Sequence, residues 1–558
     1  MKNRLWLHVL GLFLLLLGLG GYLATTRTFL LSDVGLRFWQ VQALLDNGGQ
    51  SLAVTYPGQM YDPNLQHIPF YFAYALVDGQ IFLNITPFVP LAAAGFYALF
   101  GEVGLVIVPV LGTVLTAVAV YMLLRLTNVS GAVGWFWVTA IGTPLFFYAM
   151  ELWDHTPAVA CAAWAVYGVS RAAMQDRWQP AFWGGVALGI GLGQRPEMYV
   201  FALALGLATM TMLWPRWTTA VVLALGALAG AVPLWLMQYR WVGHPLGMAL
   251  ATNLLGYGVP ESYAFEPENV LYNPAITLGR LLITVQSRSI LTFLAALLVL
   301  VGVVLLILTL RQEKWRTSRF LLLGLGLCVA GYGLYVWVAL RSSTLHGLIT
   351  TLPLIALSLA FVPAGVDNGR YRPIYRLIMT TALLFLGLML FLWPTSGGLQ
   401  WGTRYLLPII PLLVYLAAYA YQSYAAVADG AVSTALRWTL WGLVGLSVVI
   451  QLAGLWVQVG EHRLAGELQA NIEALPAPVV LTNGPFMAAH LAGVRDKTML
   501  YVADEVALAD LVARLSADGV TLIAVLPLEY VPLPVPEQVG DVALRPIAPY
   551  VYELERAP

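Results

Sequence analysis

The sequence predicts a polytopic α-helical membrane protein with about thirteen transmembrane helices and a small C-terminal α/β domain outside the membrane. Of its 558 residues, 60% are hydrophobic and only 10% are charged, whereas about 25% of a typical soluble domain is charged. Apolar runs of about 20 residues, the length that crosses a bilayer, recur through the first 460 residues. The 28 basic and 28 acidic residues cancel, so we expect membrane lipids, and no nucleic acid, among the partners.

Thirteen segments are predicted to cross the membrane. No clear cleavage site follows the first of them, so we expect it to be a retained span and not a cleaved signal peptide. The predicted spans are 5–24, 103–124, 131–150, 157–173, 178–194, 197–213, 218–239, 290–310, 320–340, 346–363, 376–394, 404–424 and 438–458.

One further apolar run, 85–100, could also cross the membrane. The distribution of positive charge indicates whether it does. If this run does not cross, the connections on the N-terminal side carry fourteen basic and four acidic residues, and those on the opposite side up to residue 460 carry eight and eleven. Cytoplasmic loops are enriched in Lys and Arg. We therefore expect 85–100 to be a re-entrant or interfacial helix, the N-terminus to be cytoplasmic and the C-terminus to lie outside.

The chain is expected to form two domains, a transmembrane domain at 1–460 and an extracytoplasmic α/β domain at 461–558. Within the first domain the outer loops 25–102 and 240–289 are long. In the second domain, strand and helix periods alternate, which favours an α/β fold. Its predicted elements are a strand at 478–482, a helix at 486–491, a strand at 498–502, a helix at 505–517, a strand at 520–526 and a strand pair near 542–555.

Asp33 is the first acidic residue after the first span. It precedes a helical pattern in which Val34, Phe38, Val41 and Leu45 share one face, as in an amphipathic helix that lies in the membrane interface. An acidic residue at this point can cap that helix. A carboxylate at the membrane surface can also accept a proton from a substrate, so both roles are open.

Two short polar stretches lie at other predicted outer span ends. Glu151, Asp154 and His155 fall within five residues, and ionisable groups at a membrane boundary are costly unless they are used or hydrated. They form either a solvated turn or part of a substrate site. Arg195 and Glu197 flank a proline. They form either an internal ion pair or a site in which the guanidinium binds a phosphate.

A glycine-rich stretch, 397–405, ends in Arg404 and Tyr405 and is a third candidate for binding an anionic head group. An aromatic belt at the membrane interface would account for Trp401 and Tyr405, but not for Arg404. Arg288 precedes a predicted span and is expected at head-group level. Arginines at outer span ends run against the usual charge bias and indicate an anionic partner on that side. They are Arg195, Arg240, Arg280, Arg288, Arg341 and Arg404.

The order of these features resembles the GT-C superfamily of membrane glycosyltransferases, in particular the bacterial branch related to protein O-mannosyltransferases and lipid A aminoarabinose transferases. The similar stretches are short but are spread over nearly the whole chain. They are Asp33, HIPFYF at 67–72, PFVPLAAAGFYALFG at 87–101, ELWDHTP at 151–157, RPE at 195–197, GGLQWGTRYLLPIIPLL at 397–413 and VVLTNGP at 479–485.

This resemblance implies the inverting transfer of a sugar from a polyprenyl-phosphate donor to a lipid, glycan or protein acceptor on the outer face. In that reaction Asp33 would be the catalytic base. The residues implied in binding substrate and phosphate are Glu151, Asp154, His155, Arg195, Glu197, Arg288, Arg404 and Tyr405. No cofactor is implied beyond a divalent cation, Mg²⁺ or Mn²⁺, whose ligands the sequence does not identify.

Two other functions remain open at this point. A transporter or flippase of a lipid-linked saccharide would share the arginine-rich outer face, but alternating access also needs polar residues within the spans, and few are present. A non-enzymatic membrane assembly protein would use the C-terminal domain for docking.

Overall fold

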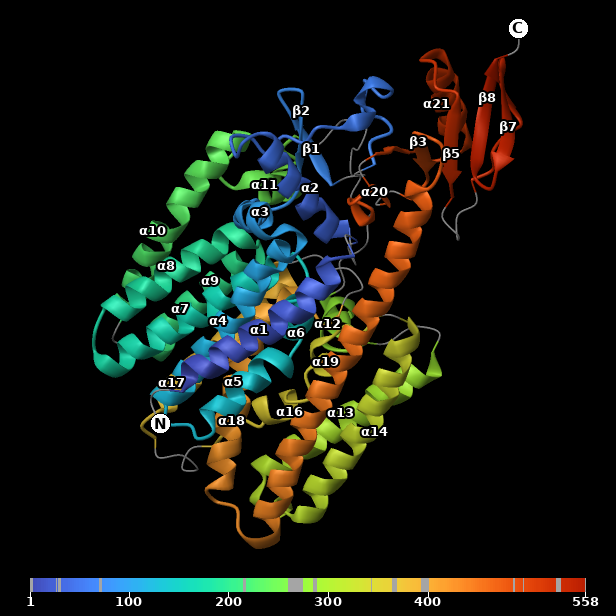
Figure 1. The fold of residues 1–558 in the computed structure, drawn as a ribbon. Helices are drawn as coiled ribbons and strands as arrows, with labels where there is room; N and C mark the ends of the chain where they lie inside the picture. The colour runs from blue at the N-terminus through green and yellow to red at the C-terminus, as the bar shows by residue number, and fades with distance from the viewer. Residues whose placement is uncertain are drawn as a thin grey trace. The chain divides into compact units, whose positions relative to one another are not determined.

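The fold is described by a computed structural model over residues 4–26, 28, 32–69, 73–213, 217–258, 274–284, 289–342, 344–363, 369–392, 401–484, 487–494, 496–527 and 533–556. Figure 1 shows a helical protein with a C-terminal sheet. Within the described residues, eight helical stretches are long and apolar enough to cross a membrane. These findings confirm the predicted fold class, an α-helical integral membrane protein with a small C-terminal α/β portion.

The chain divides into two compact units, whose bounds differ from the predicted domains. The first unit comprises Met1–Gly21, Val106–Met237 and Pro267–Val459. The second comprises Tyr22–Leu105, Gln238–Glu266 and Gly460–Pro558. The first predicted outer loop and much of the second therefore fold together with the C-terminal residues.

The first unit is built from helices, several of which pack as antiparallel neighbours. Its helices are α1 (Leu5–Ala24), α4 (Gly104–Leu126), α5 (Ala132–Ile141), α6 (Leu145–Tyr148), α7 (His155–Gln175), α8 (Gln179–Gln194), α9 (Glu197–Met212), α10 (Trp217–Val242), α12 (Pro274–Leu282), α13 (Ile290–Arg311), α14 (Ser318–Ser342), α15 (Leu348–Thr351), α16 (Ile355–Ser358), α17 (Arg372–Leu392), α18 (Ile410–Ala425) and α19 (Gly430–Glu473), with the 3₁₀ helix η5 (Arg404–Ile409) before α18. The closest packing partners are α7 with α8, α13 with α14, and α9 with α17.

Two predicted spans are not continuous helices. The segment 346–363 forms two single turns, α15 and α16, separated at Leu352 and Pro353. Proline disfavours the helical conformation of the preceding residue, and Leu352 is not helical, with φ −131° and ψ 80°. The segment 131–150 is likewise interrupted before Pro144, between α5 and α6. Both predicted spans are therefore broken helices, and their crossing of the membrane stays a prediction.

In the second unit, the predicted interfacial helix at 85–100 is α3 (Phe88–Phe100), which ends at Gly101. A helix of this length is about 20 Å long, shorter than the roughly 30 Å of a hydrocarbon core. Gly101 has a φ of 60°, in the region that favours glycine, and it separates α3 from α4. Together with α4, α3 forms one apolar helical stretch, Phe88–Leu126, and the expectation that 85–100 does not cross stays a prediction.

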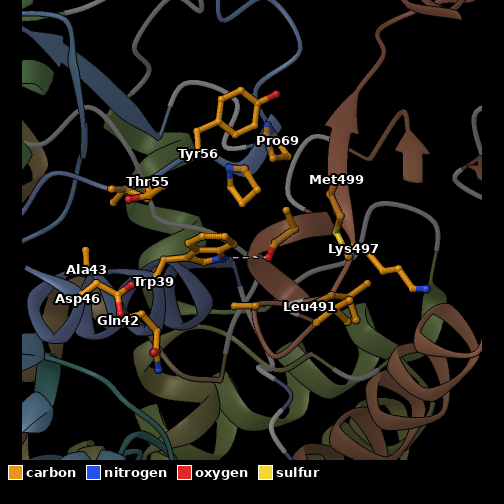
Figure 2. A pocket seen from close by; sticks show the side chains of 15 residues that line it. Trp39, Gln42, Ala43, Asp46, Thr55, Tyr56, Pro69, Leu491, Lys497 and Met499 are labelled. Carbon is orange, nitrogen blue, oxygen red and sulfur yellow. Dashed lines mark hydrogen bonds between the residues drawn. The ribbon is translucent and has the colours of Figure 1, made fainter. Parts of the chain in front are cut away.

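Helix α2 (Ser32–Asp46) is packed against protein on more than one face. Val34, Phe38 and Val41 are buried, but Leu45 is exposed, and α2 packs against α3 and α20 (Met487–His490). Figure 2 shows the indole nitrogen of Trp39 donating a hydrogen bond to the carbonyl oxygen of Ala488, at 3.3 Å. The apolar side chains of α2 are therefore covered largely by other parts of the protein, whereas the sequence predicted that lipid would cover them.

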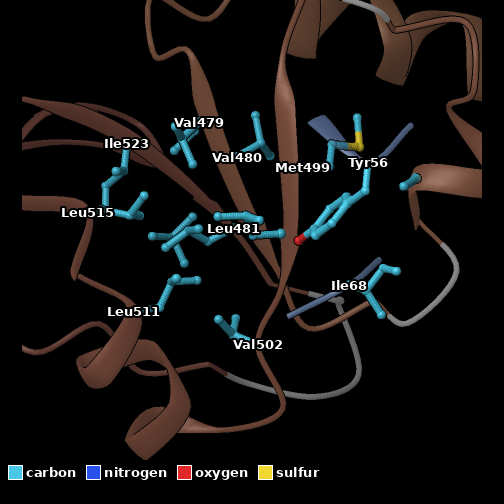
Figure 3. Close-up of a cluster of buried hydrophobic side chains, with 14 of the residues drawn as sticks. Tyr56, Ile68, Val479, Val480, Leu481, Met499, Val502, Leu511, Leu515 and Ile523 are labelled. Carbon is cyan, nitrogen blue, oxygen red and sulfur yellow. The ribbon is translucent and has the colours of Figure 1, made fainter. Parts of the chain in front are cut away.

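The C-terminal residues form the predicted α/β fold. The strands β3 (Val479–Thr482), β4 (Thr498–Tyr501), β5 (Leu522–Leu526), β6 (Gln538–Val539), β7 (Val542–Ala548) and β8 (Val551–Arg556) form a sheet in the order β4-β3-β5-β8-β7-β6. Strands β3, β4 and β5 are parallel, and β8 and β7 continue the sheet antiparallel. Helix α21 (Glu505–Ala517) supplies Leu511 and Leu515 to the core, and Tyr56 and Ile68 of the N-terminal loop enter the same core (Figure 3).

Candidate functional site

Six of the predicted site residues meet in the first unit, where the N-terminal ends of α7, α9 and η5 lie beside the C-terminal end of α8. They are Asp154, His155, Arg195, Glu197, Arg404 and Tyr405. Asp154 precedes α7, Arg195 follows α8, and Glu197 opens α9. Arg195 is extended, with φ −144° and ψ 137°, because Pro196 disfavours a helical conformation of the residue before it. The proline thus ends α8 where the arginine side chain is needed.

Arg195 forms a buried ion-pair network with two carboxylates. Its Nη1 lies 3.0 Å from Oδ1 of Asp154, and its Nε lies 2.8 Å from Oε1 of Glu197. All three side chains are at most 8% exposed. Burial lowers the pKa of Arg195, but the charges of Asp154 and Glu197 outweigh it and raise that pKa above its ordinary value. The arginine is therefore held as a cation by partners within the protein.

Helix α4 approaches the start of α7 closely enough to exclude a side chain at one position. A Cβ on Gly112 would overlap the backbone of Thr156 and Pro157. The hydroxyl of Thr156 donates a hydrogen bond to the carbonyl oxygen of Pro109, at 2.7 Å. These contacts fix the turn that carries Asp154.

His155 lies in an aromatic surrounding next to this network. Its ring centroid is 4.7 Å from that of Tyr148 and 5.0 Å from that of Trp153. Its Nδ1 is 4.0 Å from Oε1 of Glu197. Trp153, Tyr148 and His155 are all almost fully buried. Glu151 is buried as well, at 4% exposure.

Tyr405 connects Arg195 to the second predicted arginine. The guanidinium carbon of Arg195 is 6.0 Å from the centre of the Tyr405 ring, and that of Arg404 is 4.9 Å from it. Nη2 of Arg404 also donates a hydrogen bond to the Tyr405 hydroxyl, at 3.1 Å. Cations near an aromatic face are attracted by its quadrupole, so one ring holds both guanidinium groups. Arg404 is half-buried.

Hydrogen bonds to two other segments hold the stretch that carries Arg404. The amide of Gly402 donates to the carbonyl oxygen of Leu345 at 2.7 Å, and the hydroxyl of Thr403 donates to that of Leu281 at 2.8 Å. The amide of His346 in turn donates to the hydroxyl of Thr284, at 3.0 Å. The start of η5, the 344–347 connection and the end of α12 are thereby tied into one junction.

Trp401 has a structural role and does not belong to a lipid-facing aromatic belt, the alternative that its sequence position allowed. It is 1% exposed and stacks on Phe147 at a centroid distance of 5.9 Å. Its indole nitrogen donates to Oε1 of Gln451 at 3.2 Å.

Asp33 belongs to the second unit, where it lies in the first turn of α2 and its carbonyl oxygen accepts a hydrogen bond from Nη1 of Arg37, at 2.7 Å. Arg288 lies outside the described residues. The described part of the chain contains no cluster of three or more His, Cys, Asp or Glu side chains that could hold a metal ion.

Sequence reasoning missed Tyr148 and Trp153, which enclose His155. Both lie in the stretch FFYAMELWDHTP, where three aromatic residues precede the ionisable ones and a fourth interrupts them. Aromatic residues that flank a charged cluster were the available signal.

No family model and no curated protein matches the chain. Among solved structures, ArnT from Cupriavidus metallidurans bound to undecaprenyl phosphate is 13% identical, with a TM-score of 0.48 over 99% of this chain and 98% of that chain. The apo form of the same protein is 14% identical, with a TM-score of 0.44 over 88% and 87%. The oligosaccharyltransferase AglB from Archaeoglobus fulgidus, in complex with an inhibitory peptide and a dolichol-phosphate, is 11% identical, with a TM-score of 0.43 over 92% and 69%.

With identities of 11 to 14% and TM-scores below 0.5, these likenesses carry no inference about activity.

Proposed function

We propose that the protein is an inverting glycosyltransferase that moves a sugar from a polyprenyl-phosphate donor to an acceptor on the outer face of the membrane. The observation that carries the proposal is the convergence of Asp154, Arg195, Glu197, Arg404 and Tyr405 at one end of the helical unit. Each had been singled out in the sequence for this chemistry, and they come from three separate stretches of the chain.

The reaction needs two contributions from the protein. The acceptor hydroxyl attacks the anomeric carbon, the bond from that carbon to the phosphate oxygen breaks, and the polyprenyl phosphate leaves with the electron pair. A carboxylate must take the hydroxyl proton, and cations must stabilise the charge that develops on the leaving phosphate. Asp33 is proposed for the first task because it is the acid that follows the first span.

Arg404 is proposed as the phosphate-binding cation. Arg195 already makes two short ion pairs, so its charge is compensated within the protein. Arg404 is half-buried, so part of its surface is accessible, and the ring and hydroxyl of Tyr405 hold its guanidinium in place. Arg195, Asp154 and Glu197 then act as positioning residues that fix the helix ends, and Tyr405 orients Arg404.

The apolar part of the donor also has a candidate place in the first unit. A cavity of about 120 Å³ is lined almost wholly by apolar side chains, among them Leu282, Leu348, Ile409 and Leu413. These residues come from α12, α15, η5 and α18. Arg404 itself begins η5, and Thr403 before it is hydrogen-bonded to Leu281 of α12. An isoprenoid segment would suit such a lining.

The test is donor turnover in proteoliposomes that contain the full-length protein and a radiolabelled polyprenyl-phosphate sugar. Arg404→Ala should raise the KM for the donor about 10- to 100-fold, the loss of a charge-assisted hydrogen bond, and Arg404→Lys should recover part of it. Arg437→Ala, an exposed arginine of α19 that is predicted to be cytoplasmic, is the matched control and should leave the KM unchanged.

The alternatives give different results in the same assay. If labelled donor changes leaflet but no sugar leaves its phosphate, the protein is a flippase. If neither event depends on the protein, the glycosyltransferase proposal fails, and a role in membrane assembly is favoured.

A further inference from the structure

A pocket of about 260 Å³ lies within the second unit, between helix α2 and the C-terminal α/β fold (Figure 2). Trp39, Gln42 and Asp46 of α2 form one wall. Thr55 and Tyr56 belong to the loop that follows α2. Residues after α20 and the start of β4 form the remaining wall. The pocket shares no residue with the Arg195 network of the first unit.

The aromatic walls of this pocket are held in fixed orientations. The Trp39 ring is anchored by the hydrogen bond from its nitrogen to Ala488 and lies in the centre of the view in Figure 2. Tyr56 is 3% exposed, and its hydroxyl donates to the carbonyl oxygen of His67 at 3.2 Å. Walls that are already rigid lose little conformational entropy when a ligand binds. A flat ring that faces a pocket is suited to stack on a flat, C–H-bearing surface.

The polar groups at the rim have no net charge but a large capacity for hydrogen bonds. Asp46 contributes a carboxylate and Lys497 an ammonium group, and Gln42 and Thr55 contribute an amide and a hydroxyl. Lys497 is already engaged, since its Nζ donates to the carbonyl oxygen of Leu475 at 2.7 Å and lies 3.6 Å from Asp496. Among the residues that line this pocket, a phosphate or another strongly anionic ligand would meet no uncompensated cation.

The carboxylate of Asp46 does not stabilise its own helix. It is exposed and is the last residue of α2, where a negative charge interacts unfavourably with the helix dipole. Among the described residues no ion pair or hydrogen bond engages its carboxylate. A carboxylate at the mouth of an aromatic-walled pocket is an acceptor for hydroxyl donors from a ligand.

We propose that this pocket binds one neutral saccharide ring, such as a hexose or an N-acetylhexosamine. The apolar C–H face of the ring stacks on Trp39, and two hydroxyl groups donate to Asp46. Gln42 exchanges a further hydrogen bond with a ring substituent. The inference goes beyond the proposed transfer reaction, because it concerns a second saccharide site in the other unit and stands whether or not the first unit transfers a sugar.

The test is saturation-transfer NMR on the full-length protein in lipid nanodiscs, with methyl glucoside, methyl galactoside, N-acetylglucosamine and their β1,4-linked disaccharides as probes. At least one probe should receive saturation, strongest on the protons of one ring face, and empty nanodiscs should give none. Asp46→Asn should weaken binding about three- to tenfold, in line with one altered hydrogen bond. Trp39→Phe, which keeps an aromatic ring but a smaller one, should weaken it further.

Matched controls separate a lost contact from a lost fold. Asp541→Asn changes an exposed carboxylate of the same unit away from the pocket and should leave saccharide binding unchanged. The melting temperature of each variant should stay within a few degrees of the wild type, and Gln42→Leu gives a second variant that does not alter the aromatic wall. If no saccharide binds, if the pocket binds only proline-rich or aromatic peptides, or if Asp46→Asn and Trp39→Phe bind as the wild type does, the proposal is overturned.

Discussion

Replacing Arg195 with methionine would remove the cation from between Asp154 and Glu197. Both carboxylates are at most 2% exposed and lie 3.0 and 2.8 Å from the guanidinium, so solvent cannot replace it. Breaking a buried ion pair by removing one partner typically costs about 3–5 kcal/mol. Here two carboxylates lose their partner, so we expect Arg195→Met to lower the free energy of unfolding by at least that amount.

The same geometry predicts a rescue. A triple variant that combines Arg195→Met with Asp154→Asn and Glu197→Gln removes the two stranded charges together with the cation. Replacement of a complete buried ion cluster by well-packed hydrophobic residues is often close to neutral. The amides introduced here are polar, but they cost less to bury than the two carboxylates without the cation. The triple variant should therefore regain more than half of the stability that Arg195→Met loses, and this non-additivity identifies residues that act as one network.

Equilibrium unfolding in mixed micelles, with increasing SDS, measures these differences. Arg463→Met is the control, because Arg463 pairs with Glu467 on an exposed helix surface, and such pairs contribute less than about 1 kcal/mol. The reasoning is refuted if Arg195→Met costs no more than Arg463→Met, or if the triple variant is no more stable than Arg195→Met alone.

Three further substitutions test how the elements are positioned. Gly35→Ala should destabilise the second unit strongly, because a Cβ there would overlap the carbonyl oxygen of Ala489. Gly95→Ala in α3 is the control: its Cβ meets open space, so the change should be neutral or stabilising by up to about 1 kcal/mol. Limited proteolysis compares the two variants, and equal resistance to the protease would contradict the expectation. Gly112→Ala should push the start of α7 away from α4 at Pro157. The displaced positioning residues should then lower kcat by about tenfold or more. A variant that folds normally and turns over donor at the wild-type rate would show that the close approach at Gly112 does not position the site.

Much of the local structure was predictable because it depends on short-range patterns. The alternation of strand and helix periods predicted β3, β4, β5 and α21 close to their observed bounds, since each element is fixed by its own apolar periodicity. Long apolar runs likewise predicted helices such as α13 and α14. Hydrophobicity alone predicts a continuous helix in two apolar segments, 131–150 and 346–363. In the structure, the helices are interrupted at Pro144 and Pro353.

Long-range association was not predictable in the same way. Leu36, Tyr56 and Ile68 are separated by more than 400 residues from the strands whose core they enter. Apolar periodicity shows that a side chain is buried, but not which element covers it. For this reason α2 was expected in the membrane interface, although its apolar residues are covered largely by protein.

For the candidate site, too, the sequence predicted the local features but not the long-range contacts. The sequence identified Asp154, Arg195, Glu197, Arg404 and Tyr405 as polar residues at helix ends, and alternation of helix direction predicted that these ends lie on one side. It left open whether Arg195 would pair with carboxylates or face a phosphate. That choice depends on distances of about 3 Å between separate helices, which only the packed structure supplies.

The central claim, that a carboxylate of the outer loop activates the acceptor for sugar transfer, is tested most directly by single-turnover transfer with Asp33→Asn. General base catalysis contributes about 10²- to 10⁴-fold, so the variant should bind the polyprenyl-phosphate donor as the wild type does but transfer its sugar at least about 100 times more slowly. Asp78→Asn, an exposed acid of the same loop, should transfer at the normal rate. Transfer by Asp33→Asn at the wild-type rate would contradict the account.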